Sequence, residues 1–541
     1  MQLFGLLRSR SPGLSSSLIV MGGFVLSRVT GLLRDIVATS VYGTSAEAAA
    51  YRAAFSIVDL LYLVIIGGAL GSSFIPIFIE VWERDGQERA WRVASAVVTW
   101  SLLVLALASG LLFVLAPWLV QLLYGGRGFE PATLTLTTQL TRLFLLSPLL
   151  LGLGGLGMAA LNARNRFGAA ALAPTVYNLG IMLGALVGPA VGLGIWGMAW
   201  GVVGGALLYL LVQLPSLRSL GMRLRLERGR GIAEVGRVAR QMGPRVLGQA
   251  AAHLSLVVTL ALTSRLPDGA AKVAGLGYAY QLMLLPFGIF SLSLSQVAFP
   301  RLARLVAEGR RDELAADLRR TLATILWLTL PATAALLILG FPLARLLFQR
   351  GAFDTTSLAY TVEALLGYSL ALPAFAASEI LIRGFFAMQR TWTPVVVGML
   401  QVALNLTLGV LLLRAGGEVG SLALAFSLAN NLEALLLLLL MSRALPGIWR
   451  DHRYWHTVGV ALMGSILLSV VLGWLRLNSE PWLPALQAEH AYLWSRDMLR
   501  LFIWVGATGA LGAGLYLGFS ALLRVELLRS IFQRGVISRS R

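Results

Sequence analysis

The feature that most constrains this fold is a series of continuous apolar runs, which recur from Leu18 to about Leu522. Each run provides the roughly 20 residues that a helix needs to cross the hydrocarbon core of a bilayer. Only 13% of the 541 residues are charged, whereas a soluble domain averages about a quarter. The strands of a membrane β-barrel would alternate apolar and polar residues, and these runs do not. The sequence therefore predicts an all-α polytopic membrane protein, whose helices satisfy the backbone hydrogen bonds that lipid cannot.

The arginines gather in every second connection between the apolar runs. The clusters are Arg84, Arg89 and Arg92; Arg164 and Arg166; residues 218–240; residues 301–320; Arg390; and Arg443, Arg450 and Arg453. By the positive-inside rule this side is cytoplasmic, so both termini are predicted inside and the number of spans is even, about fourteen. This topology accounts for the net charge of +19, so we do not expect a nucleic-acid partner.

The chain also repeats itself at one constant offset, which is the separation between Pro76 and Pro300. The other positions that match at this offset are Leu122–Tyr124 with Leu346–Phe348, Phe129 with Phe353, and Arg166 with Arg390. Because the offset preserves orientation, we interpret it as two parallel, pseudo-symmetric six-helix lobes. The predicted organisation is a first lobe over residues 1–217, a cytoplasmic linker over 218–231, a second lobe over 232–445 and a C-terminal helix pair over 446–541, which no repeat explains.

Two facing bundles are typical of transporters that work by alternating access, with the substrate bound between the lobes. An enzyme is not expected, because the sequence contains no HExxH, CxxC, Walker A or GxSxG motif. There is no cysteine and there are only four histidines, of which His253 stands alone in a span. We therefore expect neither a metal site nor a cofactor. Membrane potential, sodium and protons are all compatible with this mode of transport.

Ionisable residues inside spans are costly and are therefore candidates for function. The first span contains Arg28, Arg34 and Asp35, and the second contains Arg52 and Asp59. Arg28 and Asp35 are seven residues apart and share a helical face, so Asp35 is predicted to orient Arg28. One interpretation is that each aspartate only neutralises an arginine. The surplus of arginine instead favours a substrate-binding site for a phosphate or diphosphate, which guanidinium groups bind in pairs of hydrogen bonds.

In the second lobe the candidates for the cavity are Arg245, Gln249, Gln281 and Glu433. Glu379 and Arg383 are four residues apart on one predicted helix, and we interpret them as a structural ion pair.

The order and spacing of five segments resemble the MurJ (MviN) lipid II flippase family, within the superfamily of multidrug, oligosaccharidyl-lipid and polysaccharide exporters. The segments are SRVTGLLRD (Ser27–Asp35), GGALGSSFIPIF (Gly67–Phe78), LNARNRFGAAALAPTVYN (Leu161–Asn178), RQMGP (Arg240–Pro244) and GSLALAFSLANN (Gly420–Asn431). The resemblance implies fourteen spans in the bacterial inner membrane with both termini cytoplasmic. It also implies export of lipid II, the undecaprenyl-diphosphate-linked peptidoglycan precursor, from the inner to the outer leaflet for cell wall biogenesis.

The resemblance further implies a cationic cavity that contains Arg28, Arg34 and Asp35, and a groove for the polyprenyl tail beside the last two helices. The partners would be lipid II and membrane lipids, and the protein would act as a monomer. The chain departs from the family pattern where Ala49, Leu63, Gln281 and Leu284 occupy positions that are often charged. The alternatives are an exporter of another polyprenyl-linked glycan, a multidrug exporter, which would require an acidic cavity, and a non-transporting membrane scaffold.

Overall fold

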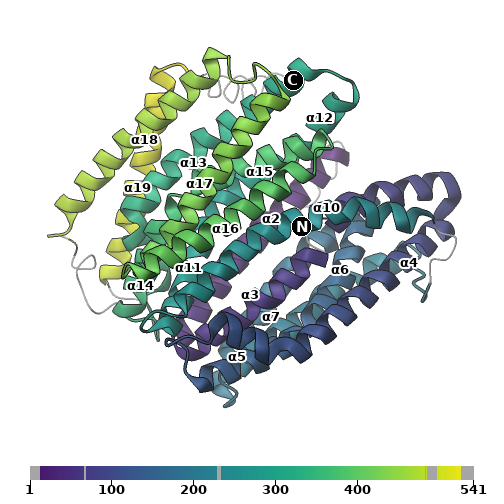
Figure 1. Ribbon diagram of the computed structural model, residues 1–541, viewed down its shortest axis with the longest axis horizontal. Helices are drawn as coiled ribbons and strands as arrows, with labels where there is room; N and C mark the ends of the chain where they lie inside the picture. Colours follow the sequence, from purple (N-terminus) through teal and green to yellow (C-terminus); the bar gives the residue numbers. More distant parts are fainter. Residues whose placement is uncertain (1–11, 66–68, 228–232, 482, 484–495, 526–541) are drawn as a thin grey trace, which may run out of the picture. The chain divides into compact units, whose positions relative to one another are not determined.

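The computed structural model describes residues 12–65, 69–227, 233–481, 483 and 496–525, and these residues form helices without any strand (Figure 1). Ten of the described helices are long and apolar enough to cross a membrane, or up to eleven if the bent pair α14 (Thr355–Ser369) and α15 (Leu372–Ala387) forms one span. The predicted class of all-α polytopic membrane protein is therefore confirmed. The number of fourteen spans stays a prediction.

The chain forms two compact units, residues 1–257 and residues 258–541. The helices of the first unit are α2 (Pro12–Tyr42), α3 (Ala46–Ile65), α4 (Ala69–Tyr124), α5 (Pro131–Phe144), α6 (Leu146–Ala163), α7 (Phe167–Ala190), α8 (Ile195–Leu211), α9 (Leu214–Ser219) and the first part of α10 (Ala233–Thr263). At Gly86 the backbone of α4 leaves helical geometry with φ of 84°. A positive φ favours glycine, so this residue allows α4 to turn from one helical segment into the next.

Two rows of glycine hold α7 against α8. The rows are Gly180, Gly184 and Gly188 on α7, and Gly197, Gly201 and Gly205 on α8. A methyl group added at Gly197 would lie 2.2 Å from the Cα atom of Gly188, and one added at Gly184 would lie 2.3 Å from the carbonyl oxygen of Gly197. Small residues at intervals of four let two helix backbones pack closely where lipid provides no hydrophobic driving force. This interface fixes α7, which also packs along α2.

The second unit contains a similar series of helices, with a π-helix, and two further helices at its end. Its elements are the last part of α10, α11 (Gly269–Pro286), the π-helix η1 (Phe287–Leu292), α12 (Ser293–Ala307), α13 (Arg311–Phe348), α14, α15, α16 (Trp392–Arg414), α17 (Val419–Ala444), α18 (His452–Ser479) and α19 (Arg496–Leu522). Within it α11 packs on α14, α16 on α17, and α13 on both α15 and α18.

The helix boundaries of the two units recur at the offset of the sequence repeat. α5 begins at residue 131 and α14 at 355; α6 ends at 163 and α15 at 387; α7 ends at 190 and α16 at 414; α8 begins at 195 and α17 at 419. Helix ends depend on local capping and turns as well as on apolar length. Agreement at four boundaries therefore indicates that the two segments are copies of one structural unit.

Local contacts recur at the same offset. Asn165 and Gln389 both adopt a positive φ, of 57° and 59°. After each of them a backbone N–H closes the end of the preceding helix, from Arg166 to Leu161 and from Arg390 to Phe385, at 2.9 Å in both cases. The ring pairs Tyr124–Phe129 and Phe348–Phe353 have centroid separations of 5.6 and 5.9 Å. The repeat thus extends from the sequence to capping and packing.

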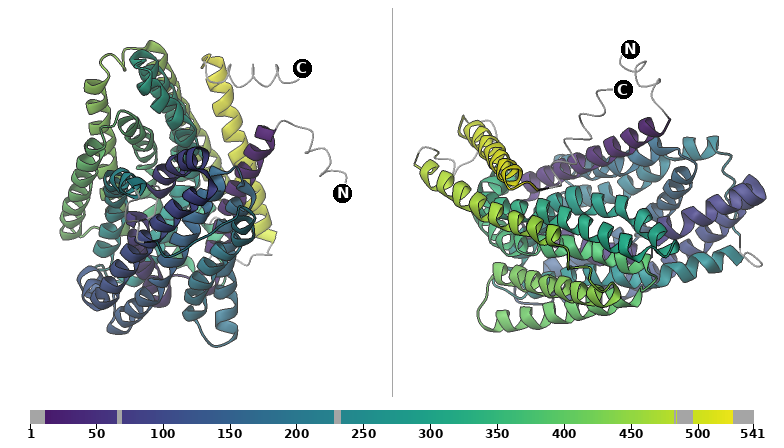
Figure 2. Two further views of the ribbon diagram at one scale, coloured as in Figure 1. Left: turned by 90° about the vertical axis from the view of Figure 1, so that its right-hand side faces the viewer. Right: turned by 90° about the horizontal axis from the view of Figure 1, so that it is seen from above.

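The two helices after the repeat, α18 and α19, lie side by side at one edge of the second unit (Figure 2). Trp327 on α13 anchors α19 through two hydrogen bonds. Its indole Nε1 donates to Ser520 Oγ at 3.1 Å, and its carbonyl oxygen accepts from the hydroxyl of Tyr516 at 2.6 Å. Large apolar side chains on the outer faces of this pair remain exposed, among them Ile466, Val470, Trp474, Phe502 and Ile503.

Candidate functional site

An ion pair between neighbouring residues lies in the middle of the predicted site on α2. The Nε and Nη2 atoms of Arg34 donate to Oδ1 of Asp35 at 3.0 and 2.8 Å. The two side chains are only 17% and 12% exposed. A charge that is buried in this way requires a partner and further hydrogen bonds. The aspartate therefore fixes the plane of the guanidinium group.

Asn178 on α7 completes the arrangement. Its Oδ1 accepts a hydrogen bond from Nη1 of Arg34 at 3.0 Å, and its Nδ2 donates to the carbonyl oxygen of Ser27 at 3.2 Å. Three of the five N–H groups of the guanidinium group are thus occupied. Two N–H groups of Arg34 form no hydrogen bond with the described residues, and these are the donors that an anionic ligand could use.

The structure corrects the predicted partner of Asp35. The heptad spacing indicated Arg28, but the carboxylate bonds to Arg34. Arg28 is half-buried and lies on the same helix, two turns earlier. The spacing argument used only the directions of the Cα–Cβ bonds, whereas a long arginine side chain can bend back to its neighbour in sequence. Gly31 lies between the two arginines, and a methyl group there would only touch Asn178 Nδ2, at 3.5 Å.

The second charged contact joins α3 to α10. Oδ2 of Asp59 lies 3.4 Å from Nε2 of His253, the histidine that stands alone in its span in the sequence. This distance is short enough for an ion pair when the imidazole is protonated. Nε2 makes no hydrogen bond within the described part of the chain. Arg34 also interacts electrostatically with Asp59. Arg52 lies on α3 two turns before Asp59 and is half-buried.

The candidates of the second lobe are not brought together by any described contact. Gln281 lies on α11 and Glu433 on α17, and both are half-buried. Arg245 and Gln249 belong to α10, but their side chains lie outside the described residues. The predicted structural pair is confirmed, since Nε and Nη2 of Arg383 donate to Oε1 of Glu379 at 2.9 and 2.6 Å.

Sequence reasoning missed Asn178 and His253. Asn178 ends one of the segments that carry the family resemblance, and a buried amide in an apolar span is itself a signal, because a polar group in lipid requires a partner. The residues next to His253 in the sequence give no indication of its role. Its partner Asp59 lies far away in the sequence, on α3, so only the contact between α10 and α3 identifies it.

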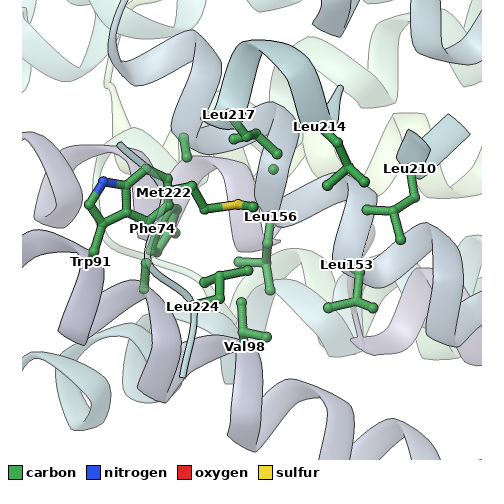
Figure 3. A pocket seen from close by; sticks show the side chains of 13 residues that line it. Phe74, Trp91, Val98, Leu153, Leu156, Leu210, Leu214, Leu217, Met222 and Leu224 are labelled. Carbon is green, nitrogen blue, oxygen red and sulfur yellow. The ribbon is translucent and has the colours of Figure 1, made fainter. Parts of the chain in front are cut away.

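A separate cavity in the first unit has a different chemistry (Figure 3). It lies between α4, α6, α8, α9 and the segment that follows α9. Its lining is entirely apolar: Phe74, Trp91, Ala94, Val98, Leu153, Leu156, Gly157, Ala160, Leu210, Leu214, Leu217, Met222 and Leu224. A diphosphate needs charged donors, so this cavity is not part of the candidate anion site.

Comparison with protein families gives one match over most of the chain. Residues 38–490 match the family described as lipid II flippase MurJ. A probable lipid II flippase MurJ of Rhizobium meliloti is 30% identical over 438 residues, which are 80% of each chain. The lipid II flippase MurJ of Burkholderia cenocepacia is 29% identical over 86% of this chain and 90% of its own.

Solved structures show the same fold. The structure titled lipid II flippase MurJ, inward closed conformation, matches with a TM-score of 0.74 at 22% identity, and covers 94% of this chain and 100% of its own. An inward-facing multidrug resistance transporter of the MATE family matches with a TM-score of 0.63 at 13% identity, over 79% of this chain and 96% of its own. At these identities the likeness concerns the fold alone.

Proposed function

This chain belongs to the lipid II flippase MurJ family, and from this premise we propose that it moves lipid II from the inner to the outer leaflet of the bacterial inner membrane by alternating access. It is a transporter in this proposal and not an enzyme. The observation that supports it is the half-satisfied guanidinium group of Arg34, which Asp35 and Asn178 hold in a fixed plane. A diphosphate oxygen can accept from its two remaining N–H groups.

Each charged residue of the first unit has a separate role in this proposal. Arg34 binds the diphosphate through its planar fork, and Asp35 and Asn178 keep that fork in place. Arg28 and Arg52 add positive charge on α2 and α3, which favours an anion without requiring direct contact. A multidrug exporter of the same fold would need negative charge for cationic drugs. Here the three arginines outnumber Asp35 and Asp59.

The direct test is replacement of the lipid II flippase of a bacterial host by this chain. We expect the cells to survive and lipid II to reach the outer leaflet. Arg34→Lys keeps the charge but replaces the planar fork by a point charge, so export should fall by about tenfold or more. Arg127→Lys, at an exposed arginine in the connection between α4 and α5, is the matched control and should export normally.

The experiment distinguishes an error in the substrate from an error in the role of Arg34. A wild-type chain that is well expressed but never supports growth would reject the lipid II assignment and favour another polyprenyl-linked glycan. If the wild-type chain supports growth and Arg34→Lys exports equally well, the lipid II function stands. The bidentate contact of Arg34 with the diphosphate is then rejected.

We also propose that the exposed apolar faces of α18 and α19 bind the polyprenyl tail. Ile466, Val470 and Trp474 recur at intervals of four residues along α18 and are all exposed, so they form one stripe that a prenyl chain could follow. A photoreactive prenyl diphosphate should crosslink to this stripe. Crosslinks that occur only in other helices would contradict the assignment.

A further inference from the structure

His253 is the one histidine that faces the charged residues of the first unit in the described part of the chain. It is 14% exposed, and its Nε2 lies 3.4 Å from Oδ2 of Asp59, which is 34% exposed. Histidine is the side chain that ordinarily gains or loses a proton between about pH 5 and 8. A proton on His253 would turn this contact into an ion pair of opposite charges.

The other titratable groups around the pair are few. Arg34 on α2 acts on Asp59, as does Tyr62 on α3. Tyr177 on α7 acts on Asp59 and Arg34, and Tyr209 on α8 faces Tyr62. The helix α6 contains no titratable side chain. On α5, the charged side chain of Arg142 donates to the carbonyl oxygen of Phe113 and so belongs to a different contact. Tyrosine remains neutral over this range, so a change of charge here falls on the pair of His253 and Asp59 itself.

The charge balance of the site depends on this proton. Arg28, Arg34 and Arg52 contribute three positive charges, and Asp35 and Asp59 contribute two negative charges, so the sum is +1 when His253 is neutral and +2 when it is protonated. Asp59 in its unpaired form attracts Arg34 and competes with an anionic ligand for it. Asp59 paired with a protonated His253 competes less.

We propose that His253 and Asp59 form a proton-binding site that controls how strongly the arginines of the first unit bind the diphosphate of the substrate. Proton uptake at His253 and substrate binding then favour each other, because linkage between two sites is reciprocal. This inference rests on the proposed function and adds to it a control of substrate binding by pH.

The first test measures binding of lipid II to the purified full-length protein as a function of pH. The diphosphate of lipid II is esterified at both ends, so it lacks the ionisation near about pH 6 that a terminal phosphate has. We expect the affinity to rise about fivefold or more between about pH 8 and 5.5. His253→Gln should abolish this dependence, and Asp59→Asn should bind tightly at both pH values. His456→Gln, at an exposed histidine of α18, is the control and should retain the full dependence.

The second test does not depend on transport. The chain has four histidines, so an NMR titration of labelled imidazole can be assigned by comparison with His253→Gln. Addition of lipid II should shift the titration of His253 to higher pH, and the shift should disappear in Asp59→Asn. The proton site would be overturned if binding by His253→Gln kept its full pH dependence. It would also be overturned if the titration of His253 did not respond to Asp59→Asn. Absence of lipid II binding at every pH would reject the proposed function, while the response of the titration to Asp59→Asn would still decide the proton site.

Discussion

At the residue scale, Arg34 combines the properties of a buried structural arginine and of a ligand-binding one. Asp35 compensates its charge and Asn178 fixes its orientation, so the folded protein bears the cost of burial without a ligand. Two N–H groups nevertheless remain for the proposed substrate. The arrangement differs from a simple neutralised pair, because Asp35 occupies only two of the five N–H groups of Arg34 and Asn178 occupies a third.

The change Asp35→Asn tests this division of roles. The amide oxygen can still accept from Arg34, but the negative charge is lost. We expect a loss of stability of about 1–3 kcal/mol, because hydrogen bonds to a charged group are replaced by weaker ones. Export should fall less than with Arg34→Lys. Thermal unfolding in detergent and export by the same preparation are the measurements. A complete loss of export by a stably folded variant would instead give Asp35 a direct role in transport.

At the element scale, the glycine rows of α7 and α8 determine where Asn178 lies. Gly197→Ala places a methyl group 2.2 Å from the Cα atom of Gly188, so the two helices must separate. Overpacking of this kind costs about 1–3 kcal/mol, and the shift of α7 should also lower export. Gly204→Ala on α8 is the matched control, since no heavy atom lies within 4 Å of its added methyl group. Equal unfolding temperatures for the two variants would show that the helices do not pack closely.

A second element-scale feature is the segment of residues 220–227 after α9. Side chains at every fourth position of α4 hold its backbone. Gln87 and Trp91 donate to the carbonyl oxygen of Leu220, at 2.8 and 3.4 Å. Ser95 Oγ donates to the carbonyl oxygen of Arg223 at 3.3 Å and accepts from the N–H of Arg225 at 3.2 Å, and Thr99 Oγ1 accepts from the N–H of Glu227 at 3.2 Å. The segment is therefore fastened along α4 and is not a free linker.

Removal of two of these side chains should loosen the segment. The chain contains no cysteine, so Met222→Cys provides a single label beneath the segment, in the lining of the apolar cavity. The double change Ser95→Ala with Thr99→Ala removes three hydrogen bonds worth about 1 kcal/mol each, so thiol labelling should accelerate by up to about a hundredfold. Ser101→Ala on the same helix is the control. Unchanged labelling in the double variant would show that apolar packing alone holds the segment.

At the scale of the whole molecule, the internal duplication and the charge distribution predict the topology together. The matched helix boundaries give the two copies the same order of elements, and the arginine clusters assign one side of the membrane to the cytoplasm. We propose cytoplasmic termini and a cytoplasmic linker on this basis. The predicted domain boundaries remain a proposal.

Single-cysteine labelling can test the topology. Ser219→Cys at the end of α9 should react with a membrane-impermeant thiol reagent only after the cells are opened. Ala132→Cys at the start of α5 should react in intact cells, because it follows a predicted crossing. Both positions are exposed. Labelling of Ser219→Cys from outside would overturn the number of spans and the assignment of the linker.

The sequence by itself determined the membrane class, the duplication and the arginines of the first span. Apolar runs and repeats are chemical properties of a continuous segment, and no distant partner is needed to interpret them. The insertion cost of Arg34 is likewise a property of the residue and its span. The same local information fixes where most helices begin and end, which explains why the offset of the sequence repeat reappears in their boundaries.

Only the tertiary structure decided which charged groups meet. Spacing along a helix gives the direction in which a side chain leaves the backbone, but not how far it reaches, so it assigned Asp35 to Arg28 when the partner is Arg34. Asn178 and His253 come from helices that are distant in sequence from those of their partners. Their positions depend on how the glycine rows pack α7 on α8, how α7 packs along α2 and how α10 reaches α3, and no local pattern contains that information.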